Sequence, residues 1–207
     1  MDSAAGQGGR RARAKEDKRQ RITGAARALF AERGVNGVTT QQIADRADVA
    51  IGTLFRYAAT KAELLIMVQN DKFATAIDEG LARLEVAERA DADGVDRLMA
   101  VISPVVRCIR EQPENGRTYL HELVFGDPDE PNRREGLALS ARLEDGLAAA
   151  LAGTADGAEA SVLARVVTSV VHVGATATLF LHRSGDEVLE DVRRQIAVVL
   201  ALRLSAA

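Results

Sequence analysis

The chain of 207 residues has the composition of an ordinary globular protein, with 47% hydrophobic and 28% charged residues. Its single cysteine, Cys108, excludes an intrachain disulfide and fits a reducing compartment such as the cytoplasm. The N-terminus lacks the apolar core of a secretory signal. The least charged run, Val166 to Leu181, would span roughly 24 Å as a helix, short of a ~30 Å bilayer core. We therefore expect a buried helix there and no membrane partner.

The net charge of −3 conceals an uneven distribution along the chain. Residues 1–61 carry 12 Lys and Arg against 6 Asp and Glu, whereas residues 62–207 carry 15 against 24. A basic segment beside an acidic remainder favours contact of the basic part with a polyanion. A solvated basic surface would give the same pattern, so charge alone leaves both interpretations open.

The first 15 residues are small, polar and basic, and we predict a disordered basic arm over 1–15. Helical periodicity begins near Glu16, where apolar residues recur at the spacing of one helix face. Gly34 is expected to end this helix.

Two short helices joined by a tight turn are predicted over residues 39–58. Thr39 and Gln42 have the spacing of a capping box, and Asp48 tolerates the left-handed backbone that the turn needs. Helices this short need packing partners, so we expect the pair to present a surface. The geometry is that of a helix-turn-helix, whose second helix enters the DNA major groove. A helical hairpin that only packs within a bundle remains the alternative.

Side chains of the DNA-reading type lie on the outward faces of these two helices. Thr53 can bond a base edge or a phosphate, and Arg56 and Tyr57 offer phosphate donors. Gly52 permits close approach of the backbone, and Gln41 could read a base edge from the preceding helix.

The chain after residue 60 is predicted to be helical almost throughout, without a convincing strand pattern. Thr60 and Glu63 predict a second capping box at its start. Turn-rich clusters separate six helices, expected over residues 60–88, 93–111, 115–126, 132–152, 158–183 and 186–204. With three helices before residue 60, the predicted fold class is all-α with about nine helices.

Residues 16–76 resemble the tetracycline-repressor (TetR) family of bacterial transcriptional regulators. The matching positions are Ile22, Ala25, Ala26, Leu29, Phe30, Gly34, Thr39, Ile43, Ala44, Val49, Gly52, Leu54, Phe55, Tyr57, Lys61 and Leu64. This sequence departs from the family pattern at Asp48, where a glycine is usual, at Ala50, where serine is frequent, and at Phe55. Tyrosine is frequent at that last position, so its hydroxyl contact with phosphate is absent.

The resemblance implies a helix-turn-helix DNA-binding domain over 16–76 and an effector-binding and dimerisation domain over 77–207. It also implies a repressor that leaves a palindromic operator when a small, largely hydrophobic ligand binds. The DNA contacts that it implies are Thr39, Thr40, Gln41, Ala50, Ile51, Gly52, Thr53, Phe55, Arg56, Tyr57 and Lys61.

The last two predicted helices favour a homodimer through residues 158–204. The first of them is apolar on most sides, and the second carries one apolar face formed by Val188, Val192, Ile196, Val199 and Leu200. Such helices must be covered, either by the chain's own core or by a second copy. A dimer would hold two DNA-binding domains at a fixed spacing, which favours covering by a second copy. The alternative is that both helices are core helices of a monomer.

Polar residues interrupt the apolar faces of several predicted helices, which is typical of a small-ligand site. The candidate ligand-binding residues are Met99, Ser103, Arg107, Tyr119, Phe125, Thr168, His172 and Thr176. Apolar walls with Arg107 and His172 predict a hydrophobic ligand with one polar or anionic end. The polar stripe that contains His172 could equally face solvent or a partner subunit.

An enzymatic function is disfavoured, and we predict no catalytic residues, no metal and no cofactor. His121, His172 and His182 lack metal-ligand spacing, and no Gly-rich phosphate loop or nucleophile elbow is present. Cys108 lies on an apolar stripe and is predicted to be a packing residue. The alternative to a regulator is a helical small-molecule-binding or enzymatic domain with an accessory basic head.

Overall fold

The computed structural model describes residues 3–127 and 129–204. Within these ranges it contains nine α-helices and one short 3-10 helix, which confirms the predicted all-α class. The chain forms two compact units, one up to Val68 and one from Gln69 onward. The boundary lies within α4 (Lys61–Arg89), eight residues before the boundary expected after residue 76.

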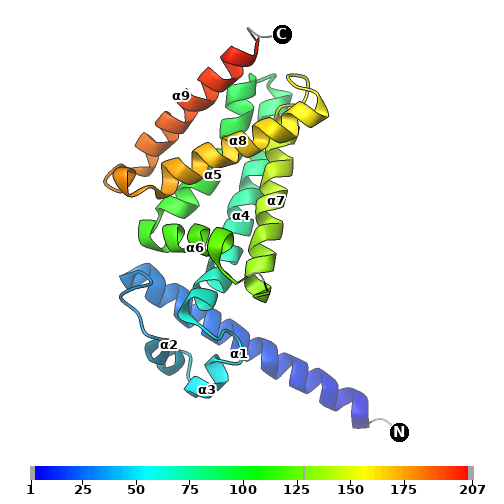
Figure 1. Ribbon diagram of the computed structural model, residues 1–207. Helices are drawn as coiled ribbons and strands as arrows, with labels where there is room; N and C mark the ends of the chain where they lie inside the picture. The colour runs from blue at the N-terminus through cyan, green and yellow to red at the C-terminus, as the bar shows by residue number, and fades with distance from the viewer. Residues whose placement is uncertain (1–2, 128, 205–207) are drawn as a thin grey trace. The chain divides into compact units, whose positions relative to one another are not determined.

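The first unit contains α1 (Ser3–Arg33), α2 (Thr40–Arg46), α3 (Ile51–Leu54) and the start of α4 (Figure 1). As predicted, α1 ends before Gly34, which adopts the left-handed region with φ 68°. The Gly34 N–H donates to the Phe30 carbonyl at 3.0 Å, as in a helix C-cap.

The basic arm expected to be disordered over residues 1–15 is instead helical from Ser3 onward. Residues 12–20 are all exposed, so packing does not hold this part of α1 in place. Alanine, arginine, lysine and glutamine are strong helix formers, and extending an existing helix costs far less than nucleating one. Met1 and Asp2 lie outside the described residues.

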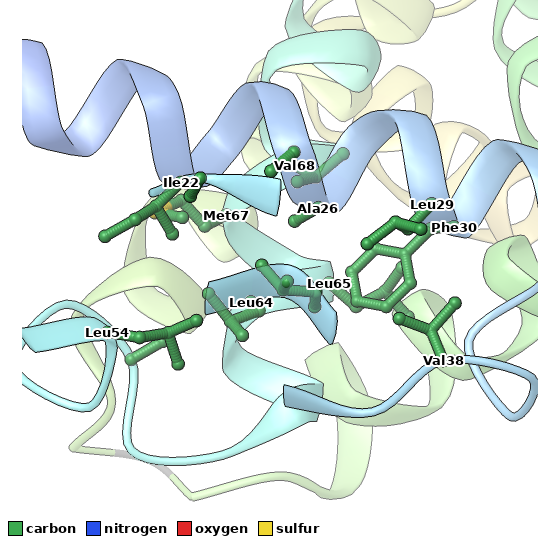
Figure 2. Close-up of a cluster of buried hydrophobic side chains, with 14 of the residues drawn as sticks. Ile22, Ala26, Leu29, Phe30, Val38, Leu54, Leu64, Leu65, Met67 and Val68 are labelled. Atoms are coloured by element: carbon green, nitrogen blue, oxygen red, sulfur yellow. The ribbon is translucent and has the colours of Figure 1, made fainter. Parts of the chain in front are cut away.

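Apolar side chains from all four helices of the first unit meet in one closed core (Figure 2). Members that are at most 4% exposed come from every helix: Ile22, Ala26, Leu29 and Phe30 of α1, Ile43 and Ala44 of α2, Leu54 of α3, and Leu64, Leu65, Met67 and Val68 of α4. Burial of these apolar side chains stabilises α2 and α3, which are too short to be stable alone.

The second unit continues with α5 (Gly94–Arg110), α6 (Pro113–Phe125), α7 (Pro131–Ala150), α8 (Gly157–Thr176), η1 (Thr178–Phe180) and α9 (Gly185–Leu204). α8 packs against α5, α6, α7 and α9, and α5 also packs against α6, α7 and α9 (Figure 1). Gly80 of α4 lies so close to α5 that an added Cβ would come within 2.5 Å of the Val101 carbonyl oxygen.

The helix predicted over 158–183 ends earlier, at Thr176, because Ala177 has an extended backbone. Arg110 of α5 holds this break together through hydrogen bonds to four backbone carbonyls. It donates to Ala175 at 3.3 Å, to Phe180 at 3.4 Å and to Leu181 at 3.3 Å, and also to Arg183. Arg110 lies 65 residues away from Ala175 in the chain, so local periodicity could not indicate this contact.

The α9 face predicted to meet a partner subunit belongs largely to the chain's own core. Val188, Val192, Ile196 and Leu200 are at most 7% exposed within the second unit. Among the helices of residues 3–127 and 129–204, α8 is the one long and apolar enough to cross a membrane, and 33% of that segment is buried. Its packing against four neighbouring helices is that of a core helix.

Candidate DNA-binding surface and ligand cavity

The first helix of the predicted helix-turn-helix begins with the expected capping box. The Thr39 hydroxyl accepts the Gln42 N–H at 3.2 Å, and the Gln42 side-chain oxygen accepts the Thr39 N–H at 2.9 Å. Two of the N–H groups that a helix start leaves unpaired are thereby satisfied. α2 turns Ile43 and Ala44 into the core and leaves Gln41 exposed.

The turn between the two helices has the left-handed residue that the sequence predicts, with Asp48 at φ 51°. Arg21 of α1 donates to the carbonyls of Ala47 at 3.1 Å and Asp48 at 3.2 Å. These hydrogen bonds fix the turn to the longest helix of the unit.

The second helix is shorter than predicted, with regular α geometry only over Ile51–Leu54. The helical path then continues through hydrogen bonds between residues three apart. The Arg56 N–H donates to the Thr53 carbonyl at 3.1 Å, and the Tyr57 N–H donates to the Leu54 carbonyl at 2.9 Å. Leu54 is fully buried, and its burial determines which face of the segment remains exposed to solvent.

The residues predicted to contact DNA all remain at least partly accessible in this unit. Thr39, Gln41, Ala50, Gly52, Phe55 and Arg56 are exposed, and Thr40, Ile51, Thr53, Tyr57 and Lys61 are partly buried. Phe55 is 45% exposed, so its ring is accessible for contact with a partner.

Besides Thr39, three of these side chains already have hydrogen-bond partners. Lys61 donates to the Val38 carbonyl at 3.0 Å, and the Tyr57 hydroxyl donates to the Lys15 carbonyl at 3.1 Å. The Gln41 amide donates to the Asp45 carboxylate at 2.7 Å. Lys61 and Tyr57 thus help to hold the unit together, whereas Gln41 would exchange one exposed partner for another on binding DNA.

The second predicted capping box is present only in part. The Thr60 hydroxyl accepts the Glu63 N–H at 3.1 Å, but the Glu63 carboxylate accepts the Ala59 N–H at 2.6 Å instead of the Thr60 N–H. The carboxylate still satisfies a backbone donor ahead of α4, one residue earlier than expected.

The second unit contains a cavity of about 350 Å³ between α4, α5, α6, α7 and α8. Its walls are mainly apolar and include Phe73, Val105, Ile109, Leu143 and Val171. The polar residues on its wall are Arg133, Ser140, Glu144, Thr168 and His172. A volume above about 300 Å³, apolar walls and a few polar groups are what small-molecule sites have in common.

Thr168 and His172 are the two predicted ligand-binding residues that line this cavity. Burial lowers the pKa of His172 below its usual value, because desolvation disfavours the charged imidazolium. The His172 ring is therefore neutral at pH 7 and can donate or accept a hydrogen bond without adding positive charge.

The other six predicted ligand-binding residues lie elsewhere in the second unit. Met99 is buried and its carbonyl accepts the Ser103 hydroxyl at 2.6 Å, while the Thr176 hydroxyl donates to the His172 carbonyl at 2.6 Å. Arg107 is 55% exposed and lies 3.9 Å from the Asp186 carboxylate. Phe125 is 73% exposed.

The last of the six, Tyr119, is 1% exposed and donates its hydroxyl proton to Asn70 of α4 at 2.9 Å. Burial raises its pKa far above the usual value, so the hydroxyl stays protonated. Burial also raises the pKa of Cys108 to about 11, which leaves its thiol protonated and unreactive at neutral pH.

The sequence patterns did not predict the polar wall that α7 contributes to the cavity. Arg133, Ser140 and Glu144 recur at intervals of seven and four residues, so they share one helix face with Leu137 between them. That spacing is the signal that could have identified them.

Comparison with known proteins shows similarity to bacterial regulators. The sequence profile of bacterial regulatory proteins of the tetR family matches residues 22–68. The HTH-type transcriptional repressor KstR of Mycobacterium tuberculosis is 32% identical over 114 residues, which cover 55% of this chain and 50% of that protein. KstR of Rhodococcus jostii is 25% identical over 196 residues, covering 90% of this chain and 84% of that protein.

Among solved structures, Thermus thermophilus FadR, a TetR family transcriptional repressor in complex with lauroyl-CoA, has a TM-score of 0.63. The two chains are 22% identical, and the match covers 86% of this chain and 93% of FadR. This likeness concerns the fold. The profile match falls on the segment whose caps, turn and core are described above. Residues 22–68 thus match the TetR family of bacterial transcriptional regulators, and the chain as a whole is similar to repressors of that kind.

Proposed function

We propose that this protein is a transcriptional repressor that binds a palindromic DNA operator as a homodimer and leaves it when a small ligand enters the cavity of the second unit. The observation that carries the proposal is the capped helix-turn-helix, whose predicted contact residues stay accessible while its core residues are buried. The basic charge of residues 1–61 supplies the attraction to DNA phosphates. Such a protein acts on the chromosome, in the cytoplasm.

In this proposal α3 and the first turn of α2 read the operator. Thr53 and Gln41 have hydroxyl and amide groups that can bond base edges, and exposed Arg56 supplies a phosphate contact. Gly52 is exposed, with no atom within 4 Å of an added Cβ, so the backbone there is free to approach DNA closely.

Operator selection from a random duplex library tests this proposal. We expect Gln41→Ala to relax one base position by about 1–3 kcal/mol of discrimination. Arg56→Ala should weaken all sequences alike and reduce the salt dependence by about one counterion. If both variants and the parent select the same operator with equal affinity and equal salt dependence, the assignment of Gln41 and Arg56 to the DNA-binding surface is wrong.

The proposed dimer uses the exposed apolar residues of α8 and α9, since the buried face of α9 is already covered. Val162, Val166 and Val173 of α8 are 51%, 38% and 56% exposed, and Val198 and Leu202 of α9 are 58% and 67% exposed. Each set recurs at the spacing of one helix face. Two such helices meeting their symmetry mates would form a four-helix interface.

Sedimentation of Val166→Glu/Leu202→Glu tests the dimer. Both side chains are exposed in the single chain, so the variant should fold and sediment as a monomer. Val86→Glu, at a 60% exposed position on α4, is the matched control and should remain a dimer. A dimer of unchanged affinity in the double variant would place the interface elsewhere.

The proposed ligand is small and largely hydrophobic, because the cavity is walled mainly by apolar side chains. In FadR the same fold is seen with lauroyl-CoA, so a helical unit of this kind has room for an apolar chain. The ligand would act by binding more tightly to the form of the repressor that does not fit the operator, because only a difference in affinity shifts an equilibrium.

A further inference from the structure

The cavity carries a single cationic side chain among the described residues that line it, and this is Arg133 of α7. His172 adds no positive charge at neutral pH, because burial lowers its pKa. Glu144, the acidic residue of the wall, lies eleven positions further along α7, which is roughly 16 Å at the rise of an α-helix. The two charges therefore belong to different ends of the cavity.

The Arg133 guanidinium is held by one edge only. Its Nε donates to the Glu122 carbonyl at 3.1 Å and its Nη2 donates to the Val124 carbonyl at 3.3 Å, both in the last turn of α6. These two nitrogens lie on the same side of the planar group. One proton of Nη1 and the second proton of Nη2 point along the end-on edge, which neither carbonyl occupies.

That second edge has the geometry of a carboxylate-binding fork. Within residues 3–127 and 129–204, no carboxylate forms an ion pair with Arg133. The nearby buried Glu130 is occupied as the cap of α7, where it accepts the N–H groups of Asn132 and Arg133. The α6 carbonyls fix the orientation of the guanidinium in advance, so an anion would bind without ordering the side chain first.

We propose that Arg133 is the anion-recognition residue of this cavity and that the ligand is an apolar molecule ending in a carboxylate. The inference rests on the proposed ligand response and names its ligand class. Since a cavity of 150 Å³ holds benzene, one of 350 Å³ has room for roughly fourteen non-hydrogen atoms. Two parallel N–H···O bonds from the free edge would hold the carboxylate, and the apolar wall would hold the remainder.

Isothermal titration of the full chain with decanoate and decan-1-ol, below their aggregation concentrations and without DNA, tests the proposal. The two probes share an apolar chain and differ in the terminal group. We expect the parent to bind decanoate at least tenfold more tightly than decanol. Equal affinities, or tighter binding of decanol, would overturn the proposal without any variant.

Arg133→Gln should bring the decanoate affinity down to that of decanol, while Arg134→Gln, at the exposed neighbouring position, should keep the parent's preference. Decanol binding to Arg133→Gln reports whether the cavity survives the substitution. If it does not, Arg133→Lys keeps the charge without the fork, and it should lose most of the preference for decanoate. A preference that is undiminished in either variant overturns the proposal.

Failure of this inference and failure of the proposed function give different results. A parent protein that binds its selected operator but shows no preference for decanoate over decanol would reject the anion site alone. A parent protein that prefers decanoate but binds no selected operator would reject the repressor and leave the anion site standing.

Discussion

The two units of this chain bury their side chains in different ways. In the first unit the core is apolar and closed, and its polar groups serve as caps and turn contacts at the ends of short helices. All the buried polar residues in the described part of the chain belong to the second unit: Gln69, Asn70, Arg110, Asn115 and Glu130. The second unit also contains the cavity. A closed core presents a fixed surface, whereas a unit with empty volume and buried polar groups has room for a ligand.

A pair of leucine-to-alanine substitutions gives the largest expected contrast between the two units. Leu65 of α4 is fully buried in the first core, so Leu65→Ala should destabilise that unit by about 3 kcal/mol. Leu137 lies on the cavity wall and is 40% exposed, so Leu137→Ala should cost under about 1 kcal/mol. Urea unfolding of each variant measures both values. Equal costs would mean that the first core is not the better packed of the two.

Arg110 tests whether the second unit depends on its buried polar groups. Arg110→Met keeps much of the side-chain volume but leaves the carbonyls at the end of α8 and just after it without their donor, which should cost about 2 kcal/mol. Arg107→Met, one turn earlier and 55% exposed, is the control and should change the unfolding free energy by less than about 0.5 kcal/mol. An Arg110→Met variant as stable as the parent would show that the break after α8 does not need the arginine.

The cap of α2 tests how far the first unit relies on local signals. Thr39→Ala removes the acceptor of the Gln42 N–H and should cost about 1 kcal/mol of unfolding free energy. Thr39→Ser keeps the hydroxyl and serves as the control. Should both variants lose the same stability, the methyl group of Thr39 and not its hydroxyl would be what matters.

The smallest expected effect concerns pH and His172. Its lowered pKa means that the unfolded chain takes up a proton below about pH 6.5 where the folded chain does not. Stability contributed by the neutral ring is therefore present above pH 6.5 and is lost as the pH falls. Denaturant titrations between pH 5 and 7 should show a steeper decline for the parent than for His172→Gln. Identical slopes would mean that the ring is solvated.

Much of the first unit follows from short-range patterns. The end of α1 at Gly34, the capping box of Thr39 and Gln42, and the left-handed Asp48 were all predicted, because each is a local backbone requirement met by neighbouring residues. The exposed contact residues follow in turn, since the helix period decides which side chains face outward. Partners distant in the chain, such as Lys15 for Tyr57, were not predictable from spacing.

In the second unit, the sequence by itself determined the helices but not which of their faces meet. The helix count and the apolar stripes follow from periodicity, which needs only neighbours within about one turn. Tertiary packing decided that the α9 stripe is core, that α8 stops at Thr176, and that Arg133 faces the cavity in place of Arg107. An apolar face satisfies the hydrophobic effect equally well against its own chain, a ligand or a second copy, because that effect has no direction. Only the tertiary arrangement selects among these partners.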